Sequence, residues 1–201
     1  ELGQHGHVFR PGPFHRRRAY WLDGAVLHWR IGSAEGHAQL ADIASMRLYL
    51  PEGTGTAARC VLVEKAGRVH KLCDRYFPRW TKEERHYWGR LQRREATFRG
   101  LTFTLARRLK KANPEALFEM GPGRGEWIAS CIVAALAIAI IVGGALLMLW
   151  QREFHLAPAA FMALVASYLP MLWPVIRSGG PKPFDPEALH NANPPPDWVA
   201  W

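Results

Sequence analysis

The sequence lacks the short motifs that mark the common catalytic sites. It contains no Gly-x-Ser-x-Gly, no His-Glu-x-x-His and no Gly-x-Gly-x-x-Gly that follows a strand. The glycine-rich segment Gly121–Gly125 lacks the lysine and hydroxyl residue that hold a nucleotide and its metal in a phosphate-binding loop. These absences predict that the chain is not an enzyme and that Gly121–Gly125 is a hinge.

Cysteine is scarce, and its three copies do not form a metal-binding pattern. Cys60 and Cys73 stand alone rather than in paired Cys-x-x-Cys motifs, and Cys131 lies inside an apolar run. The histidines within residues 1–15 have no cysteine or carboxylate beside them, which favours a solvated arm over a metal site. We therefore expect three free thiols, no bound metal and no cofactor.

Charge is absent from two long runs, residues 127–150 and 156–176. At ~1.5 Å per residue, the first run spans about 36 Å as a helix, which is enough for a hydrocarbon core of ~30 Å. The second holds three prolines but is also uncharged. We predict a transmembrane hairpin of two helices. A haem between them would need histidines inside the spans, and the nearest one, His155, lies in the loop.

Before these runs, basic residues outnumber acidic residues. Residues 1–125 hold 23 Lys+Arg and 12 Asp+Glu, whereas residues 126–201 hold 3 and 5. Basic residues near the ends of a span stay on the cytoplasmic side. This predicts a multi-pass membrane protein with both termini in the cytoplasm. Tryptophans at the ends of the runs are the expected interfacial anchors: Trp127, Trp150 and Trp173.

Short β-rich runs separated by turns fill residues 19–73. Asp23-Gly24 lies between two such runs, which is the strongest short signal for a β-hairpin. A turn is expected over residues 32–36, and residues 39–50 are expected to begin with a short turn and to continue as an alternating strand. Further strands are expected over residues 56–64 and 68–72. We predict five or six short strands in all. Residues 1–18, rich in Gly, Pro, His and Arg, are expected to be an extended arm.

One long amphipathic helix is predicted after the strands. Thr81 and Glu84 have the spacing of a capping box, and Asn113-Pro114 marks the end. Apolar residues follow helical spacing at Trp88, Leu91, Phe98, Leu105 and Leu109. The domain then covers residues 19–113, residues 114–126 are a linker, and residues 177–201 are an extended C-terminal tail.

Hairpins followed by one amphipathic helix are similar to the element order of a pleckstrin-homology-like (PH-like) domain. Residues 40–48, Leu-Ala-Asp-Ile-Ala-Ser-Met-Arg-Leu, resemble the third-strand segment of bacterial membrane-anchored PH-like proteins, where a hairpin with a glycine turn precedes it. The resemblance covers about residues 15–110. It implies an α+β fold, a small β-barrel or sandwich capped by the helix, and a binding or assembly module. The spans follow the domain here, whereas bacterial members often place them first.

Two sets of residues are candidate binding surfaces. Lys and Arg near an anionic leaflet contribute ~1 kcal/mol each, and such residues adjoin the first span at Arg107, Arg108, Lys110, Lys111 and Arg124. Alternatively, they determine topology alone. Small residues recur four apart at Ala135, Ala139 and Gly143 in the first span and at Ala159, Ala163 and Ser167 in the second. Such faces pack a hairpin on itself or against the helices of a larger complex.

These features together favour a non-catalytic accessory or assembly subunit of a larger bacterial membrane complex, of the respiratory or photosynthetic kind. Tails of this composition need a partner to order them. The alternative is a free-standing membrane-anchored PH-like module that binds anionic lipid or a peptide. Nucleic acid is not an expected partner, because the chain carries a membrane segment and no recognisable nucleic-acid docking element.

Overall fold

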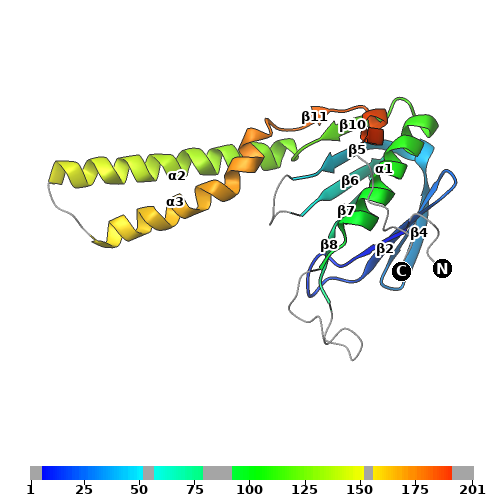
Figure 1. Cartoon of the computed structure of the whole chain (residues 1–201), viewed down its shortest axis with the longest axis horizontal. Helices are drawn as coiled ribbons and strands as arrows, with labels where there is room; N and C mark the ends of the chain where they lie inside the picture. Colours follow the sequence, from blue (N-terminus) through cyan, green and yellow to red (C-terminus); the bar gives the residue numbers. More distant parts are fainter. Residues whose placement is uncertain (1–5, 52–56, 79–91, 152–155, 192–201) are drawn as a thin grey trace. The chain divides into compact units, whose positions relative to one another are not determined.

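The computed structural model describes residues 6–51, 57–78, 92–151 and 156–191, which form two compact units (Figure 1). The first unit contains the described residues up to Met120 and those from Pro183 onward. The second unit is Gly121–Lys182. The first unit is an α+β fold, as predicted, and the second consists of two apolar helices.

A four-stranded antiparallel sheet opens the first unit. Its strands follow one another in the order β1 (Gly6–Phe9), β2 (Arg18–Asp23), β3 (Val26–Ile31) and β4 (Ala34–Gln39). The predicted hairpin at Asp23-Gly24 is confirmed, and Gly24 has the positive φ of 56° that such a tight turn requires.

The predicted turn over residues 32–36 is shorter than expected, because β4 already begins at Ala34. Gly36 lies directly opposite Trp29 in this sheet. A Cβ atom at position 36 would collide with the Trp29 indole, so the glycine serves ring packing within a strand rather than a turn.

The second sheet is mixed and has the order β11-β10-β5-β6-β7. Its strands are β5 (Ile43–Tyr49), β6 (Arg59–Glu64), β7 (Val69–Cys73), β10 (Leu117–Met120) and β11 (Lys182–Pro183). The 3-10 turn η1 (Leu40–Asp42) leads into β5, as the sequence predicts. A separate two-stranded sheet pairs β8 (Arg75–Tyr76) with β9 (Gln92–Arg93).

The predicted arm and linker both contain strands. Gly6–Phe9 is strand β1, and His7 and Phe9 are fully buried, because the aromatic side chains pack inside the first unit. In the predicted linker, β10 runs parallel to β5, and the Arg47 side chain on β5 contacts the Glu119 carboxylate at 2.7 Å. Residues 6–9 and 117–120 therefore belong to the domain itself.

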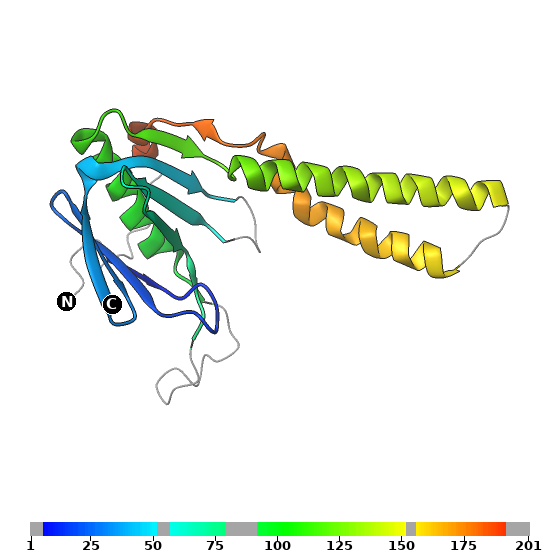
Figure 2. The ribbon, with the colours of Figure 1, turned by 180° about the vertical axis from the view of Figure 1, so that it is seen from behind.

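Helix α1 (Glu95–Ala112) is shorter than the predicted helix. The expected cap at Thr81 lies outside the described residues. Gln92 and Arg93 are in β9, where the backbone is extended rather than helical. The predicted end is confirmed: Asn113 is the C-cap, and its Nδ2 donates to the Ile43 carbonyl at 2.9 Å. α1 lies against one side of the sheets, in front of them in Figure 1 and behind them in Figure 2.

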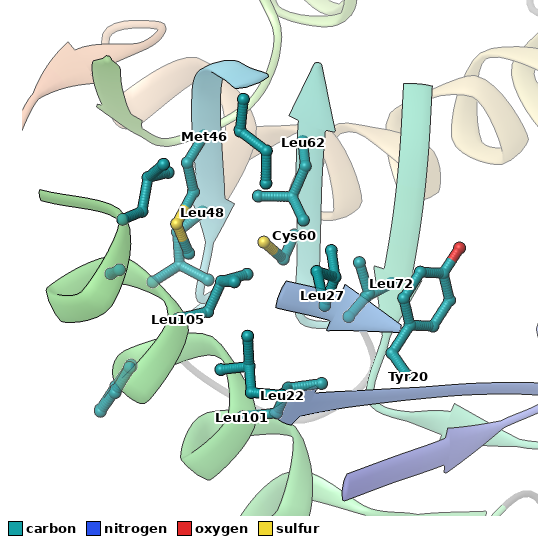
Figure 3. Close-up of a cluster of buried hydrophobic side chains, with 14 of the residues drawn as sticks. Tyr20, Leu22, Leu27, Met46, Leu48, Cys60, Leu62, Leu72, Leu101 and Leu105 are labelled. Carbon is teal, nitrogen blue, oxygen red and sulfur yellow. The ribbon is translucent and has the colours of Figure 1, made fainter. Parts of the chain in front are cut away.

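One core joins α1 to both sheets. Figure 3 shows Leu105 of α1 near Leu48 of β5 and Leu101 of α1 beside Leu22 of β2. Met46 of β5 and Leu62 of β6 belong to the same cluster, and all six side chains are at most 5% exposed. Within the described residues, no strand ladder joins β4 to β5 or β1 to β7, so the two sheets do not close into a barrel, which was one of the two predicted arrangements.

The second unit consists of α2 (Arg124–Gln151) and α3 (Leu156–Arg177). α2 begins three residues before the predicted span and is long and apolar enough to cross a membrane, by length and composition alone. In α3 the apolar stretch Leu156–Pro170 is shorter than a span, and Pro170 and Pro174 lie inside the helix. The structure thus supports one candidate span, and the second remains a prediction.

Candidate functional site

The basic residues predicted to face a membrane do not all lie in one unit. Arg107 and Lys111 are exposed on α1, whereas Arg108 and Lys110 are partly buried. The Arg108 guanidinium donates from Nη1 to the Gly24 carbonyl at 2.9 Å, which ties α1 to the β2–β3 turn. Arg124 is exposed but belongs to the second unit. Arg107 and Lys111 are therefore the clearest candidates for a headgroup contact on α1.

Helices α2 and α3 contact each other through residues that the spacing argument did not select. Ala134 and Ala137 are the buried residues of α2. Gly144 lies against α3, and a Cβ atom at this position would lie 2.6 Å from the Met162 sulfur. At the other end of the hairpin, the Trp127 indole donates from Nε1 to the Ile176 carbonyl at 3.2 Å.

The predicted small-residue faces are mostly directed away from this contact. Ala135, Ala139 and Gly143 are exposed on α2, and Ala163 and Ser167 are exposed on α3. Ala159 alone is partly buried. In the described hairpin, self-packing therefore uses the neighbouring face of α2. The face of α2 that meets α3 is the one with glycine or alanine opposite the larger side chains of α3, such as Met162.

The three predicted tryptophan anchors differ in their surroundings. Trp150 is 87% exposed and Trp173 is 60% exposed, as side chains at a membrane surface would be in the absence of lipid. Trp127 is partly buried and bonded to the α3 backbone, so it also joins the two ends of the hairpin. Sequence spacing alone does not reveal this second role.

The chain returns to the first unit after α3. The Phe184 amide donates to the Phe118 carbonyl at 3.2 Å, and the two rings meet edge to face at 5.8 Å. The 3-10 helix η3 (Pro186–Asn191) follows, and Leu189 packs against the core of the first unit. Residues 184–189 are thus part of the domain, not of a detached tail, because Phe184 and Leu189 cover apolar surface there.

A buried histidine is the most perturbed imidazole that the structure describes. His7 Nε2 donates to the Cys73 carbonyl at 2.8 Å, since a carbonyl can only accept. Nδ1 is then an acceptor, 2.9 Å from the Thr97 hydroxyl, whose one proton is shared between this nitrogen and the Arg94 carbonyl at 3.2 Å. Burial, helped by the charge of Arg94, lowers the pKa of His7 to about 4. The sequence argument placed His7 in a solvated arm, although the adjacent Val8-Phe9 pair is a weak strand signal.

The two cysteines of the first unit and His70 are buried or partly buried within the fold. Cys60 is fully buried, and burial raises the pKa of its thiol far above the usual range. Burial also raises the pKa of Cys73. His70 Nε2 lies 2.6 Å from a Glu64 carboxylate oxygen. Among the described residues, no group of three His, Cys, Asp or Glu side chains is placed to hold a metal ion.

Comparison with protein-family models, with curated proteins and with solved structures finds no match to this chain. The arguments for its function therefore rest on its own residues: an exposed apolar hairpin, a domain formed from both sides of that hairpin, and a helix with exposed basic side chains.

Proposed function

We propose that this chain is a non-catalytic accessory subunit that inserts α2 and α3 into the bacterial inner membrane and assembles with a larger integral membrane complex, of the respiratory or photosynthetic kind. The observation that carries the proposal is the apolar surface of α2. Only 11% of its most apolar 18-residue window is buried by the rest of the chain. A core helix of a water-soluble domain is buried by its own chain, whereas a lipid-facing or partner-facing helix is not.

The domain composition supports a pair of crossings. If α2 alone crossed a bilayer, residues before Gly121 and after Lys182 would lie on opposite sides. Phe118 and Phe184, however, are bonded within one folded unit. In this proposal the chain therefore crosses back, and α3 is the apolar segment available for the second crossing. Both ends of the hairpin then lie on one side, which the basic excess before it places in the cytoplasm.

The first unit provides the cytoplasmic part of the proposed assembly. A four-strand meander, a second sheet and then helix α1 follow the element order of a PH-like module, without a closed barrel in the described residues. In this proposal the module holds the cytoplasmic surface of the complex while the outer face of α2 packs in the bilayer. That face presents Ala135, Ala139 and Gly143, at which two helices approach closely.

Assembly with a larger complex has a direct test. The tagged full-length chain, extracted from its native membrane in mild detergent, is expected to migrate on native gels well above the mass of its monomer or dimer. Ala139→Leu should release the chain from this band, because a bulky side chain separates closely packed helices. The matched control is Ala145→Leu, an equally exposed position on another face of α2. Migration of the unaltered protein as a monomer or dimer would refute the assembly role.

The exposed Arg107 and Lys111 side chains favour the alternative, a free-standing module that binds anionic lipid. Under this alternative, the affinity of the detergent-purified chain for anionic vesicles, measured by cosedimentation, should weaken about a hundredfold when Arg107, Lys110 and Lys111 are all changed to Gln, since each charge contributes ~1 kcal/mol. Changing Arg30, Arg59 and Arg68 on the strands and their turns to Gln removes the same charge elsewhere. Equal binding to neutral vesicles would contradict lipid recognition.

A further inference from the structure

Two histidines face each other on the outer surface of the first sheet. His28 on β3 and His37 on β4 are direct partners in the antiparallel ladder. The residues beside them in the two strands, Leu27 and Ala38, are buried in the first unit, so the two imidazoles project from the opposite face of the sheet. His37 is exposed and His28 is partly buried. The sequence analysis did not pair these histidines, because only the strand register brings them together.

The neighbours of this histidine pair hold its register and the orientation of one ring. The next pair along the two strands is Trp29 with Gly36, where a Cβ atom at position 36 would collide with the indole. A slip of β4 along β3 would place a larger residue opposite that indole. From the other side, the Trp21 ring of β2 stacks on the His28 ring at 5.4 Å, with an interplanar angle of 10°. The two imidazoles are thus presented by a regular sheet.

The two rings have the spacing of ligands that share one metal ion. Their centroids are 6.0 Å apart, and their planes are tilted by 43°. A metal ion bonded at ~2.1 Å to a ring nitrogen lies about 3.2 Å from the centroid of that ring, so two rings on a tetrahedral ion have centroids about 5.2 Å apart. The His28 and His37 rings therefore need to approach by less than about 1 Å, which small side-chain rotations supply.

The imidazole nitrogens are available to a ligand. In the part of the chain that the structure describes, neither ring forms a hydrogen bond or an ion pair. The outward pair nearer the turn is Arg30 with Glu35, and these two side chains form an ion pair with each other. Glu35 thereby balances the positive charge of Arg30 beside the histidines, which reduces its repulsion of a bound cation. The described residues add no third His, Cys, Asp or Glu ligand to the pair.

We propose that His28 and His37 together bind one divalent first-row transition-metal ion, with water at its other coordination positions. Neutral imidazole nitrogen is a good ligand for Cu²⁺, Ni²⁺ and Zn²⁺, whereas Mg²⁺ and Ca²⁺ prefer oxygen. Two imidazoles on one hairpin act as a chelate, because an ion bound by one ring is already close to the other. This site lies in the first unit, runs against the sequence expectation of no bound metal, and does not depend on the proposed membrane assembly.

The test uses the full-length chain in detergent micelles, treated with a chelator, dialysed and titrated with copper(II), nickel(II) or magnesium chloride in a calorimeter. We expect Cu²⁺ to bind more tightly than Ni²⁺, and Mg²⁺ not to bind at this site. Either His28→Gln or His37→Gln should weaken the Cu²⁺ affinity by at least about tenfold, since even the loss of an outer-shell partner of a metal site costs ~10–100-fold. The matched control is His15→Gln, which removes an exposed imidazole outside the pair and should leave this affinity unchanged.

Stoichiometry and spectroscopy distinguish a shared ion from separate ones. Each single variant, and the double variant, should lose the same one ion, and the electron paramagnetic resonance spectrum of the Cu²⁺ form should show fewer coupled nitrogens in His37→Gln. Binding should also raise the thermal unfolding midpoint of the unaltered protein but not of His37→Gln. Loss of one ion in each single variant and of two in the double variant would show independent sites and refute the proposal.

Two further outcomes would also refute it. One is unchanged Cu²⁺ affinity in His28→Gln and His37→Gln, which would place the metal elsewhere on the chain. The other is an equal response to Mg²⁺, which would show binding to oxygen ligands rather than to imidazole. Failure of the membrane assembly test leaves all of these outcomes unaffected, because both histidines belong to the first unit.

Discussion

Replacing Phe98 with alanine is expected to lower the free energy of unfolding of the first unit by about 4 kcal/mol. Phe98 is fully buried on α1, and its ring packs edge-on against His7 of β1 at 5.6 Å. Truncation removes the apolar transfer free energy of the ring and leaves a cavity that the two sheets cannot fill by small movements.

The matched control for Phe98→Ala is Phe14→Ala. Phe14 is 99% exposed, so the same truncation should change the free energy of unfolding by no more than about 0.5 kcal/mol. Urea unfolding of the full-length chain in detergent micelles, followed by far-ultraviolet circular dichroism, measures both. Similar losses in the two variants would contradict the docking of α1 onto the sheets.

Acid is expected to destabilise the first unit through His7. Folding lowers the pKa of His7 from 6.5 to about 4, so the unfolded chain takes up the proton first as the pH falls. The contribution of the neutral ring is therefore complete above pH 6.5 and is lost progressively between pH 6.5 and about pH 4. The total loss is about 3 kcal/mol, because one pKa unit corresponds to about 1.4 kcal/mol.

A comparison of variants isolates this effect from the carboxylates that also titrate in acid. His7→Gln should be less stable than the unaltered protein at pH 7.5, because it loses ring packing and at least one buried hydrogen bond. The difference between the two proteins should shrink by about 3 kcal/mol at pH 4. In His37→Gln, which alters an exposed imidazole on β4, the acid sensitivity should remain. A difference that is constant with pH would show that His7 is not held neutral.

Both predictions concern the packing of strand β1 against helix α1. The His7 ring accepts from Thr97 near the start of α1 and donates to Cys73 at the end of β7. The His7 ring therefore links strand β1 to strand β7 and to helix α1. The stacking continues into the first sheet, because the Phe9 ring lies 5.3 Å from His7 and 5.9 Å from Tyr20 of β2.

Several elements were predictable because their signals are local. The Asp23-Gly24 turn, the strands β2, β3, β5, β6 and β7, and the end of α1 at Asn113 follow from turn chemistry, alternation and the effect of proline on the preceding residue. The uncharged runs in turn predict the two apolar helices. Two of the candidate site residues, Arg107 and Lys111, are exposed on α1, and their contact with a lipid headgroup stays a prediction.

Other features depend on residues that are distant along the chain. Strand β10 is recognisable only beside β5, where Glu119 meets Arg47 across 72 positions. From the sequence alone, Phe184 and Leu189 were assigned to an extended tail. In the structure they pack against the core of the first unit. Which face of α2 meets α3 was likewise beyond spacing arguments. A small-residue stripe permits close approach, but the side chains opposite, such as Met162, decide the rotation.

The sequence by itself thus determines the local elements and the apolar hairpin, because turns, periodicity and the absence of charge act over a few residues. Only the tertiary structure decides that residues on both sides of the hairpin form one domain and that His7 is neutral and buried. Burial and desolvation arise from neighbours brought together by folding, and no short stretch of sequence contains them.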